Sequence, residues 1–390
     1  MADTDLRPEP FVSFVCKVAS RCNLNCDYCY VYQHADQSWR QQPLRMSTST
    51  AAQLGRRINE HAVAHRLDQV DVILHGGEPL LLGVRYLRKL CEAVADNTPD
   101  VAIRWNGQTN GTAYTDEVLA FCREWDISFG LSIDGPRADN DRHRLDHSGR
   151  SLFDEVERAA ALLGSAEGRP LWGGVLAVVD LAADPVATYS YLRSLHPPSI
   201  DFLLPLGHHD APPPGKKGAP DGTPYADWLL RIFDLWYHER PQPIRIRRFR
   251  DIIALYLGAT HSSEEWGLQP VDFIVVEANG EIQAVDTLKV TYPGACDLGM
   301  NIFEESFDQA LRSAPVQSRQ HSWQTLSDTC QSCDLVRICG GGYFPHRYSQ
   351  ENGFRNPSVY CADLKKLIRT VTGRVGHDLR KLPGHPGRDT

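Results

Sequence analysis

The sequence predicts an α/β fold, a partial barrel of six parallel β/α units followed by a smaller cysteine-rich C-terminal domain. Three observations support this prediction. Six short apolar, β-branched runs alternate with amphipathic stretches between residues 11 and 206. A proline- and glycine-rich segment then interrupts the pattern, and five of the eleven cysteines lie after residue 295. The alternation indicates parallel βαβ units, and six units fall short of the eight that close a full barrel.

The predicted strands and helices alternate strictly along the first half of the chain. Each strand is a short run of apolar residues, and each helix is a longer stretch with apolar residues on one face. We expect Cys16 in the first strand and Cys91 and Cys122 on apolar helix faces, as core residues and not as ligands. Strands are predicted at 11–18, 69–74, 101–106, 127–133, 172–179 and 200–206, and helices near 49–65, 84–96, 115–125, 151–165 and 185–195.

The second half of the chain is less regular. Residues 207–223 are rich in proline, glycine and histidine and predict a long loop or lid. Within it, His208 and His209 are better explained as a solvated pair than as metal ligands. Residues 274–285 predict a hairpin that turns at its Asn-Gly pair. The predicted divisions are an N-terminal lead at 1–10, a partial barrel at 11–240, a helical linker at 241–271, an auxiliary domain at 272–381 and a disordered tail at 382–390.

The composition excludes several classes of function. The chain of 390 residues has a formal net charge of −8, so it has no general basic field for nucleic acid. No segment reaches the apolar length of a membrane span, and the first residues lack a charged-then-apolar signal. Eleven cysteines indicate metal or redox chemistry in a reducing compartment. We therefore expect a cytoplasmic protein with no nucleic-acid or membrane partner.

Three cysteines follow the first predicted strand with C-x3-C-x2-C spacing: Cys22, Cys26 and Cys29. A 4Fe–4S cluster has four irons, so three thiolates from one loop leave one iron open to a small molecule. A zinc site would normally show C-x2-C pairs with a fourth ligand nearby, and core cysteines would be spread along strands and helices. A disulfide framework belongs to small secreted domains. The spacing therefore predicts a cluster that performs chemistry.

Polar or glycine-rich segments also follow the next three predicted strands, at 75–79, 108–111 and 132–136. In barrels of this kind, ligands bind at the C-terminal ends of the strands. The cysteine loop and these three segments should therefore meet on one face of the barrel and form one site.

The cysteine loop, with the aromatic Tyr28 before its last cysteine, resembles the signature of radical S-adenosylmethionine (SAM) enzymes. The next loop, Gly76-Gly77-Glu78-Pro79, resembles their GGEP motif. The resemblance covers most of the chain and implies a partial (β/α)6 radical SAM barrel whose open iron chelates SAM. An electron from the cluster would cleave SAM to a 5′-deoxyadenosyl radical. The resemblance also implies an external one-electron reductant of flavodoxin or ferredoxin type.

The resemblance further implies which side chains contact SAM. Glu78 would bind the SAM ammonium by a charge-assisted hydrogen bond, and Arg144 would pair with the SAM carboxylate. The segment with Ser132 and Asp134 has a structural turn as its alternative explanation. The implied set of SAM contacts is Tyr28, Gly76, Gly77, Glu78, Pro79, Gln108, Asn110, Ser132, Asp134 and Arg144.

A second cysteine group near the C-terminus resembles the SPASM extension of peptide-modifying radical SAM enzymes. Its members are Cys330, Cys333, Cys339 and Cys361. The family pattern C-x2-C-x5-C-x3-C has Tyr343 at its fourth position here, and Val285 stands at another cysteine position. The resemblance therefore implies one auxiliary 4Fe–4S cluster instead of two, with Cys296 as a free thiol. A zinc knuckle with the same four thiolates is the alternative.

Asp286 falls where sulfatase-maturing members of this family carry a catalytic aspartate, which implies a proton acceptor. An aspartate at a strand end is the structural alternative. The N-terminal run at 11–32 and the Val285–Asp286 departure resemble the cyclophane-forming, FxsB-type peptide maturases. That resemblance implies abstraction of a Cβ hydrogen, addition of the carbon radical to an aromatic ring, and loss of an electron to the auxiliary cluster and of a proton to Asp286.

The implied substrate is a ribosomally made precursor peptide with a leader. No separate recognition domain is expected before the barrel, so the leader would bind the core enzyme, for example by adding a strand to a sheet edge. Three alternatives remain open. They are a sulfatase-maturing enzyme that forms formylglycine, a thioether-forming maturase, and a non-catalytic iron–sulfur regulatory protein.

Overall fold

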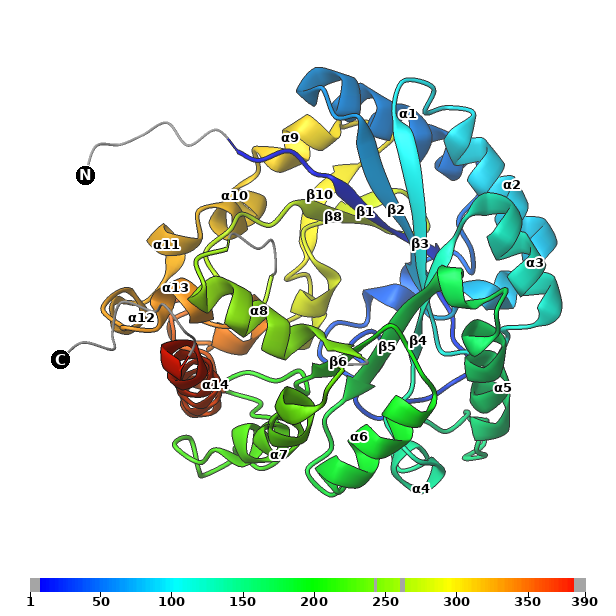
Figure 1. Cartoon of the computed structure of the whole chain (residues 1–390). Helices are drawn as coiled ribbons and strands as arrows, with labels where there is room; N and C mark the ends of the chain where they lie inside the picture. Colours follow the sequence, from blue (N-terminus) through cyan, green and yellow to red (C-terminus); the bar gives the residue numbers. More distant parts are fainter. Residues whose placement is uncertain (1–7, 242–243, 260–263, 382–390) are drawn as a thin grey trace.

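One ten-stranded sheet organises the protein. The computed structural model describes residues 8–241, 244–259 and 264–381. The strand order is β10-β9-β8-β1-β2-β3-β4-β5-β6-β7, and the strands lie inside an outer ring of helices (Figure 1). The strands are β1 (Ser13–Ala19), β2 (Gln69–Gly76), β3 (Ala102–Thr109), β4 (Ser128–Ser132), β5 (Trp172–Val178), β6 (Ser199–Leu203), β7 (Arg245–Ile246), β8 (Phe273–Val276), β9 (Glu281–Gln283) and β10 (Asp297–Asn301).

The first seven strands are parallel neighbours in chain order, which is the βαβ topology that the alternating pattern predicts. All six predicted strands are confirmed, with ends that differ by a few residues. The largest differences are at β3, which continues to Thr109, and at β6, which ends at Leu203 so that the apolar residues 204–206 continue as coil. The connecting helices are α1 (Thr48–His65), α2 (Val84–Ala95), α3 (Asp116–Trp125), α4 (Arg137–Asn140), α5 (Phe153–Gly164) and α6 (Pro185–Ser194).

Short polar side chains define where several of these helices begin. Ser47, Thr115 and Asp184 each accept a hydrogen bond from a backbone N–H in the first turn of α1, α3 and α6. Such caps satisfy donors that the helix itself leaves unpaired. The apolar face of each helix then packs on the sheet, so the cap and the apolar stripe together fix each βα unit.

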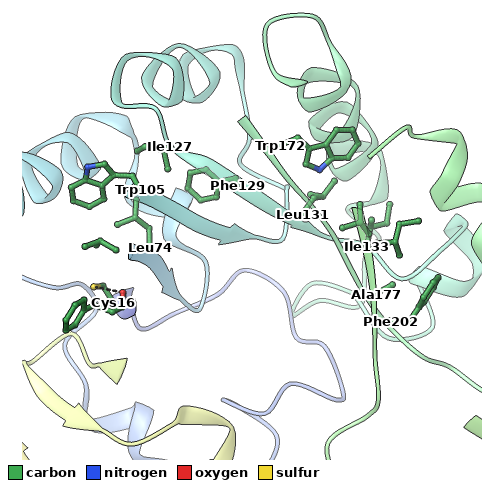
Figure 2. Packing of buried hydrophobic residues seen from close by; sticks show 14 of the residues in the cluster. Cys16, Leu74, Trp105, Ile127, Phe129, Leu131, Ile133, Trp172, Ala177 and Phe202 are labelled. Atoms are coloured by element: carbon green, nitrogen blue, oxygen red, sulfur yellow. Dashed lines mark hydrogen bonds between the residues drawn. The ribbon is translucent and has the colours of Figure 1, made fainter. Parts of the chain in front are cut away.

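The core lies between the sheet and the helices. Figure 2 shows side chains of β1 to β6, among them Leu74, Trp105, Phe129 and Leu131, packed in one continuous layer. Cys16 belongs to this layer on β1, while Cys91 and Cys122 are fully buried on α2 and α3. The prediction that these cysteines are core residues is confirmed.

The C-terminal part joins the barrel through the sheet. Strand β8 pairs in parallel with β1, and β8 and β9 form the predicted antiparallel hairpin. The predicted linker contains β7 and α8 (Arg247–Tyr256), and α8 follows the edge strand directly. Short helices and one long helix complete this part: α9 (Phe307–Leu311), α10 (Ala314–Gln320), α11 (Ser322–Thr325), α12 (Asp328–Gln331), α13 (Val336–Cys339) and α14 (Cys361–Lys381).

The segment 207–223 is a loop, as predicted, and it is tied to α14. The buried Lys216 ammonium lies 2.8 Å from the Asp363 carboxylate and also donates to two carbonyl oxygens of its own loop. Asp363 in turn accepts the N–H groups of Tyr225 and Ala226 at the start of α7 (Pro224–His238). The prediction of a solvated histidine pair is wrong for His208, which is buried against the Tyr348 ring, while the exposed His209 ring lies 2.8 Å from the Pro357 carbonyl oxygen. These contacts fix the loop against the C-terminal part.

The described residues include no helix that is both long and apolar enough to cross a bilayer. The predicted tail at 382–390 and most of the predicted lead at 1–10 lie outside the described residues.

Candidate functional site

The C-terminal ends of β1 to β6 open into a pocket with a volume of about 520 Å³. The cysteine loop after β1 and the ends of β2, β3 and β4 contribute one side of it. Residues of β5, β6, the 264–273 segment and the C-terminal part contribute the other. The four predicted segments therefore meet on one face of the barrel, as the sequence predicts.

The three N-terminal cysteines lie on the wall of this pocket. Cys22 Sγ accepts the Leu24 N–H at 3.4 Å and the Asn110 side-chain amide at 3.5 Å. Burial raises the pKa of Cys22 to about 12 and that of Cys26 to about 11. The thiols therefore stay protonated unless a metal displaces the proton. Three thiols on one loop, Cys26 buried and Cys22 and Cys29 half-buried, all line a large cavity and fit a cluster with one iron left open.

Two glycines let the GGEP loop lie directly against the cysteine loop. Gly77 N–H donates to Ala19 O at 2.8 Å, and Glu78 N–H donates to Arg21 O at 3.0 Å. A Cβ on Gly77 would lie 2.3 Å from Arg21 O. Any larger residue would therefore separate the two loops. Gly76 and Gly77 both line the pocket.

Glu78 is fully buried and lies behind the pocket wall. Its carboxylate accepts hydrogen bonds from Leu80 N–H, Asn110 N–H and the Thr109 hydroxyl at 2.6–3.0 Å. Burial raises the pKa of Glu78 to about 7 in spite of these bonds. In this structure Glu78 therefore braces the loop after β3, and Pro79 begins the short 3-10 helix at Pro79–Leu82. Its contact with the SAM ammonium stays a prediction.

Tyr28, Asp134 and Arg144 form a buried chain of hydrogen bonds on the pocket wall. The Tyr28 hydroxyl donates to Asp134 at 2.5 Å and accepts from Arg144 at 2.9 Å. The Nε of Arg144 is enclosed and has no partner among the described residues. The same side chain lines the pocket, so its guanidinium fits an anionic ligand group there. The carboxylate of SAM is such a group.

The remaining implied SAM contacts also lie on the wall. Gln108 donates to the Ser132 hydroxyl at 2.8 Å, which joins the ends of β3 and β4. Asn110 reaches from the β3 loop to Asn23 at 3.0 Å. Of the ten implied contacts, Glu78 and Pro79 are the two that are not on the pocket wall. The donors and the open cavity therefore fit SAM.

Asp286, singled out from the sequence, is buried beside the pocket in a cluster with three residues that were not predicted, two of which contact it directly. Lys17 forms an ion pair with it, the Tyr30 hydroxyl donates to it at 2.6 Å, and His75 lies 3.2 Å from Lys17. Burial by itself would raise the pKa of Asp286, but the Lys17 charge and the hydrogen bonds from Lys17 and Tyr30 together outweigh burial and hold the pKa well below its usual range. A lysine inside the apolar run at 11–18 was the available signal for this cluster.

The four C-terminal cysteines meet at one small cavity beside α14. Arg347 donates to the carbonyl oxygens of Gly340 and Gly342 and so fixes the loop after Cys339. Elsewhere in the described part of the chain, one group of three side chains has the composition of a metal site, with ligand atoms within 4.8 Å of one another. Its members are His61, His65 and Asp308. Four cysteine thiolates are a complete ligand set for either a zinc ion or a 4Fe–4S cluster.

The position of a second auxiliary cluster is filled by apolar side chains. Val285 packs with Leu288, Cys296 and Phe344, and the Phe344 ring stacks on Phe354 with centroids 4.4 Å apart. Cys296 is buried and unpaired, and burial raises its pKa to about 12. These residues do not fit an inner auxiliary cluster.

Tyr343 occupies the remaining cysteine position of the family pattern. It donates to or accepts from the Thr287 hydroxyl at 2.5 Å, and both residues line the large pocket. The chain thus has a hydrogen-bonded hydroxyl pair at a place where the pattern calls for a ligand thiol.

Comparison with known proteins agrees with this site. Residues 16–179 match the family model of the Radical SAM superfamily. The chain is 27% identical over 362 residues to a serine-type anaerobic sulfatase-maturating enzyme of Bacteroides thetaiotaomicron, covering 88% of this chain and 84% of that one. It is 26% identical over 381 residues to a cysteine-type enzyme of Clostridium perfringens, covering 94% and 98%.

Solved structures show the same fold. The enzyme anSMEcpe with bound AdoMet superposes with a TM-score of 0.79 at 22% identity, covering 95% of this chain and 100% of that one. Streptococcus suis SuiB bound to its precursor peptide SuiA gives 0.59 at 14% identity, covering 90% and 76%. The radical SAM family uses a 4Fe–4S cluster and SAM, for which the wall described above is suited. Residues 16–179 are therefore a radical SAM domain, and the described chain has the radical SAM α/β fold with a C-terminal extension.

Proposed function

We propose that this protein is a radical SAM maturase that crosslinks an aromatic ring to the β-carbon of a nearby residue in a precursor peptide. The observation that carries the peptide part is the shape of the pocket. One part of the lining holds the three cysteines and the predicted SAM contacts, and the rest combines apolar side chains with Arg247, Glu264, Glu265 and Asp272, which can receive the side chains and polar groups of a peptide. Leu176, Val178, Leu203 and Phe273 are among those apolar side chains.

The proposed ligands for the SAM-binding cluster are Cys22, Cys26 and Cys29, and those for one auxiliary cluster are Cys330, Cys333, Cys339 and Cys361. When bound, the two clusters and SAM supply a 5′-deoxyadenosyl radical and an electron acceptor. Arg144 anchors the SAM carboxylate through the part of its guanidinium that lines the pocket, and Gly76 and Gly77 give SAM a wall without side chains. These side chains bind and orient; the hydrogen abstraction itself belongs to the cofactor.

Asp286 accepts the proton that leaves the crosslinked ring. Forming one ring-to-Cβ bond removes the Cβ hydrogen as an atom, and then one electron and one proton from the ring. Asp286 is ionised beside Lys17 and is linked to the pocket through the Tyr30 hydroxyl, which lines it. The Tyr30 hydroxyl would pass its proton to Asp286 as it takes one from the ring, so that the carboxylate acts as the general base through Tyr30.

Formylglycine formation is the second candidate, favoured by the curated relatives named above, which match nearly the whole chain. Two features of this chain favour crosslink formation over formylglycine formation. Val285 and Tyr343 replace cysteines of the SPASM pattern, and an apolar cluster fills the position between them. A thioether-forming maturase and a non-catalytic iron–sulfur protein remain as outcomes of the test below.

The test is anaerobic co-expression with candidate precursor peptides, followed by mass spectrometry. A cyclophane predicts loss of two hydrogen atoms per crosslink, no reaction with a hydrazide, and no backbone fragments between the linked residues. An aldehyde that reacts with a hydrazide would establish formylglycine, and loss of a free cysteine thiol would establish a thioether. Absence of 5′-deoxyadenosine from reduced protein with SAM would show that it is not an enzyme. Cys26→Ala is the control without the cluster.

A further inference from the structure

His75 stands at the end of β2, immediately before the two glycines of the pocket wall. Its side chain lines the large pocket and is half-buried. It therefore lies at the junction between the predicted SAM contacts and the apolar side chains of the pocket.

The hydrogen bonds of His75 fix which ring nitrogen carries the proton. Its Nδ1 accepts the Gly76 backbone N–H at 2.8 Å and lies 3.2 Å from the Lys17 ammonium. Both neighbours are donors only, so Nδ1 must offer its lone pair. A neutral imidazole has one N–H, and that proton must then be on Nε2.

A second proton on the ring is strongly disfavoured. Burial, followed by the charge of Lys17, lowers the pKa of His75 to about 3. Lys17 is itself held in place by its ion pair with Asp286 and by the Tyr30 hydroxyl at 3.1 Å. The ammonium therefore cannot turn away and release Nδ1. His75 stays neutral and in one tautomer throughout the ordinary pH range.

The Nε2–H group points to no acceptor in the described part of the chain, where all hydrogen bonds of the His75 ring are made by Nδ1. Nε2 is also not among the enclosed polar atoms that lack a partner. The atom is therefore open to the pocket that His75 lines. A fixed donor with no protein acceptor, at the wall of a large pocket, is arranged for a ligand acceptor.

We propose that His75 is a specificity-determining residue whose Nε2–H donates to a carbonyl oxygen of the peptide bound in the pocket. This inference rests on the proposed peptide substrate. The bound peptide segment must place a hydrogen-bond acceptor at His75, and an apolar or aromatic side chain of that segment must pack on Leu176, Val178 and Phe273. An ammonium or guanidinium at His75 itself would oppose one donor with another and is disfavoured there, whereas Glu264, Glu265 and Asp272 offer it acceptors elsewhere on the pocket wall.

Two probes with the same ring test the preference directly on the reconstituted protein. N-acetyl-L-phenylalanine methylamide offers carbonyl acceptors, and phenethylammonium offers only a cationic donor. The first should bind and shift the His75 Nε2–H resonance in ¹⁵N-histidine-labelled protein. The second should leave that resonance unshifted. His75→Leu should weaken binding of the first probe about tenfold, the value of one hydrogen bond. His75→Gln, whose amide also donates, should restore most of the affinity.

His377→Leu, a change at an exposed histidine of α14, is the matched control and should leave probe binding unchanged. The tautomer is read from the same spectra, with Nε2 protonated and Nδ1 unprotonated between about pH 6 and 8. A proton on Nδ1, or equal binding by wild type and His75→Leu, overturns the inference. Because neither readout needs turnover, probe binding through His75 without any modified peptide would remove the proposed function alone. Full peptide crosslinking by His75→Leu would remove the inference alone.

Discussion

The Lys17 ammonium is paired with the Asp286 carboxylate inside the protein, although the first lies on β1 and the second follows β9. Both side chains are nearly inaccessible, at 4% and 9% exposed. The pair joins the barrel to the C-terminal part at the edge of the pocket. It also determines the state of two other groups, because Lys17 contacts His75 and Asp286 accepts from Tyr30.

Breaking this pair should be costly to the fold. Lys17→Met leaves a buried carboxylate without its cation, and we expect a loss of about 3–5 kcal/mol in the free energy of unfolding. The double variant Lys17→Met/Asp286→Leu removes both charges and should lose clearly less than the sum of the single changes. Urea unfolding measures all three. Arg123→Ala, at an exposed pair with Glu167, is the control and should cost under about 1 kcal/mol. Additive losses would show that the two charges do not interact.

Removing only the charge of Asp286 should separate SAM cleavage from product formation. We expect Asp286→Asn to form 5′-deoxyadenosine nearly as wild type does, because the predicted SAM contacts lie elsewhere on the wall. Product should fall by at least about 100-fold, the lower range for loss of a general base. The ratio of product to 5′-deoxyadenosine, from chromatography of the same reaction, is the measurement. A normal ratio would exclude Asp286 as the proton acceptor.

Arg144 should control the affinity for SAM. Its side chain lines the pocket, and a charged hydrogen bond of about 1.5–3 kcal/mol corresponds to about 10- to 150-fold in Kd. We therefore expect Arg144→Leu to weaken SAM binding by that factor, measured by equilibrium dialysis under anaerobic conditions. Arg150→Leu, at a side chain 78% exposed, should leave the affinity unchanged. Equal affinities in both variants would exclude the proposed contact.

Iron counting tests the number of clusters. Two 4Fe–4S clusters give about eight irons per chain, and we expect about four after Cys333→Ala or Cys361→Ala. Cys296→Ala should keep about eight, because that thiol is buried among Leu288, Val285 and Phe344. Colorimetric iron and sulfide assays on the reconstituted protein provide the values. About twelve irons, or a loss on replacing Cys296, would contradict a single auxiliary cluster.

His61, His65 and Asp308 should make stability depend on pH. His61 Nε2 accepts the Phe11 N–H at 3.0 Å, so its Nδ1 carries the proton that is shared with Asp308 at 2.6 Å. Burial lowers the pKa of His61 in the folded protein. A histidine with a lowered pKa stabilises the fold at pH values above the pKa of the unfolded chain, about 6.5, and this stabilisation is lost as the pH falls.

Asp308 acts in the same direction at lower pH. Burial opposes ionisation of Asp308, but hydrogen bonding to His65 and the other His contacts leave its pKa below the usual value, so its contribution is lost below about pH 4. We expect the urea midpoint of wild type to fall between about pH 7 and 5, and that of His61→Gln to fall less over this interval. Parallel midpoints for the two proteins would show that His61 does not contribute.

The same geometry argues against a metal at these three residues. A metal on His61 Nδ1 would place the ring proton on Nε2, where it would face the donating Phe11 N–H. The group is thus a hydrogen-bonded contact between α1 and α9.

Features that depend only on neighbouring residues could be predicted from the sequence. The alternation of apolar runs gave the six strands, because the periods of strands and helices are local properties. The spacing of Cys22, Cys26 and Cys29 was enough for the cluster loop, since all three side chains come from one turn of chain. The order of the strand ends then predicted that four segments meet, because parallel strands open on one face.

Contacts between residues that are far apart in the sequence depend on the tertiary structure. Lys17, His75 and Asp286 are separated by up to 269 positions, and the pairing of β8 with β1 brings them together. The tertiary structure also places Glu78 behind the pocket wall, and it surrounds Val285 with apolar side chains. Burial then set the charge states, because desolvation keeps His75 neutral while the nearby ammonium keeps Asp286 ionised. A local pattern carries no information on such long-range contacts.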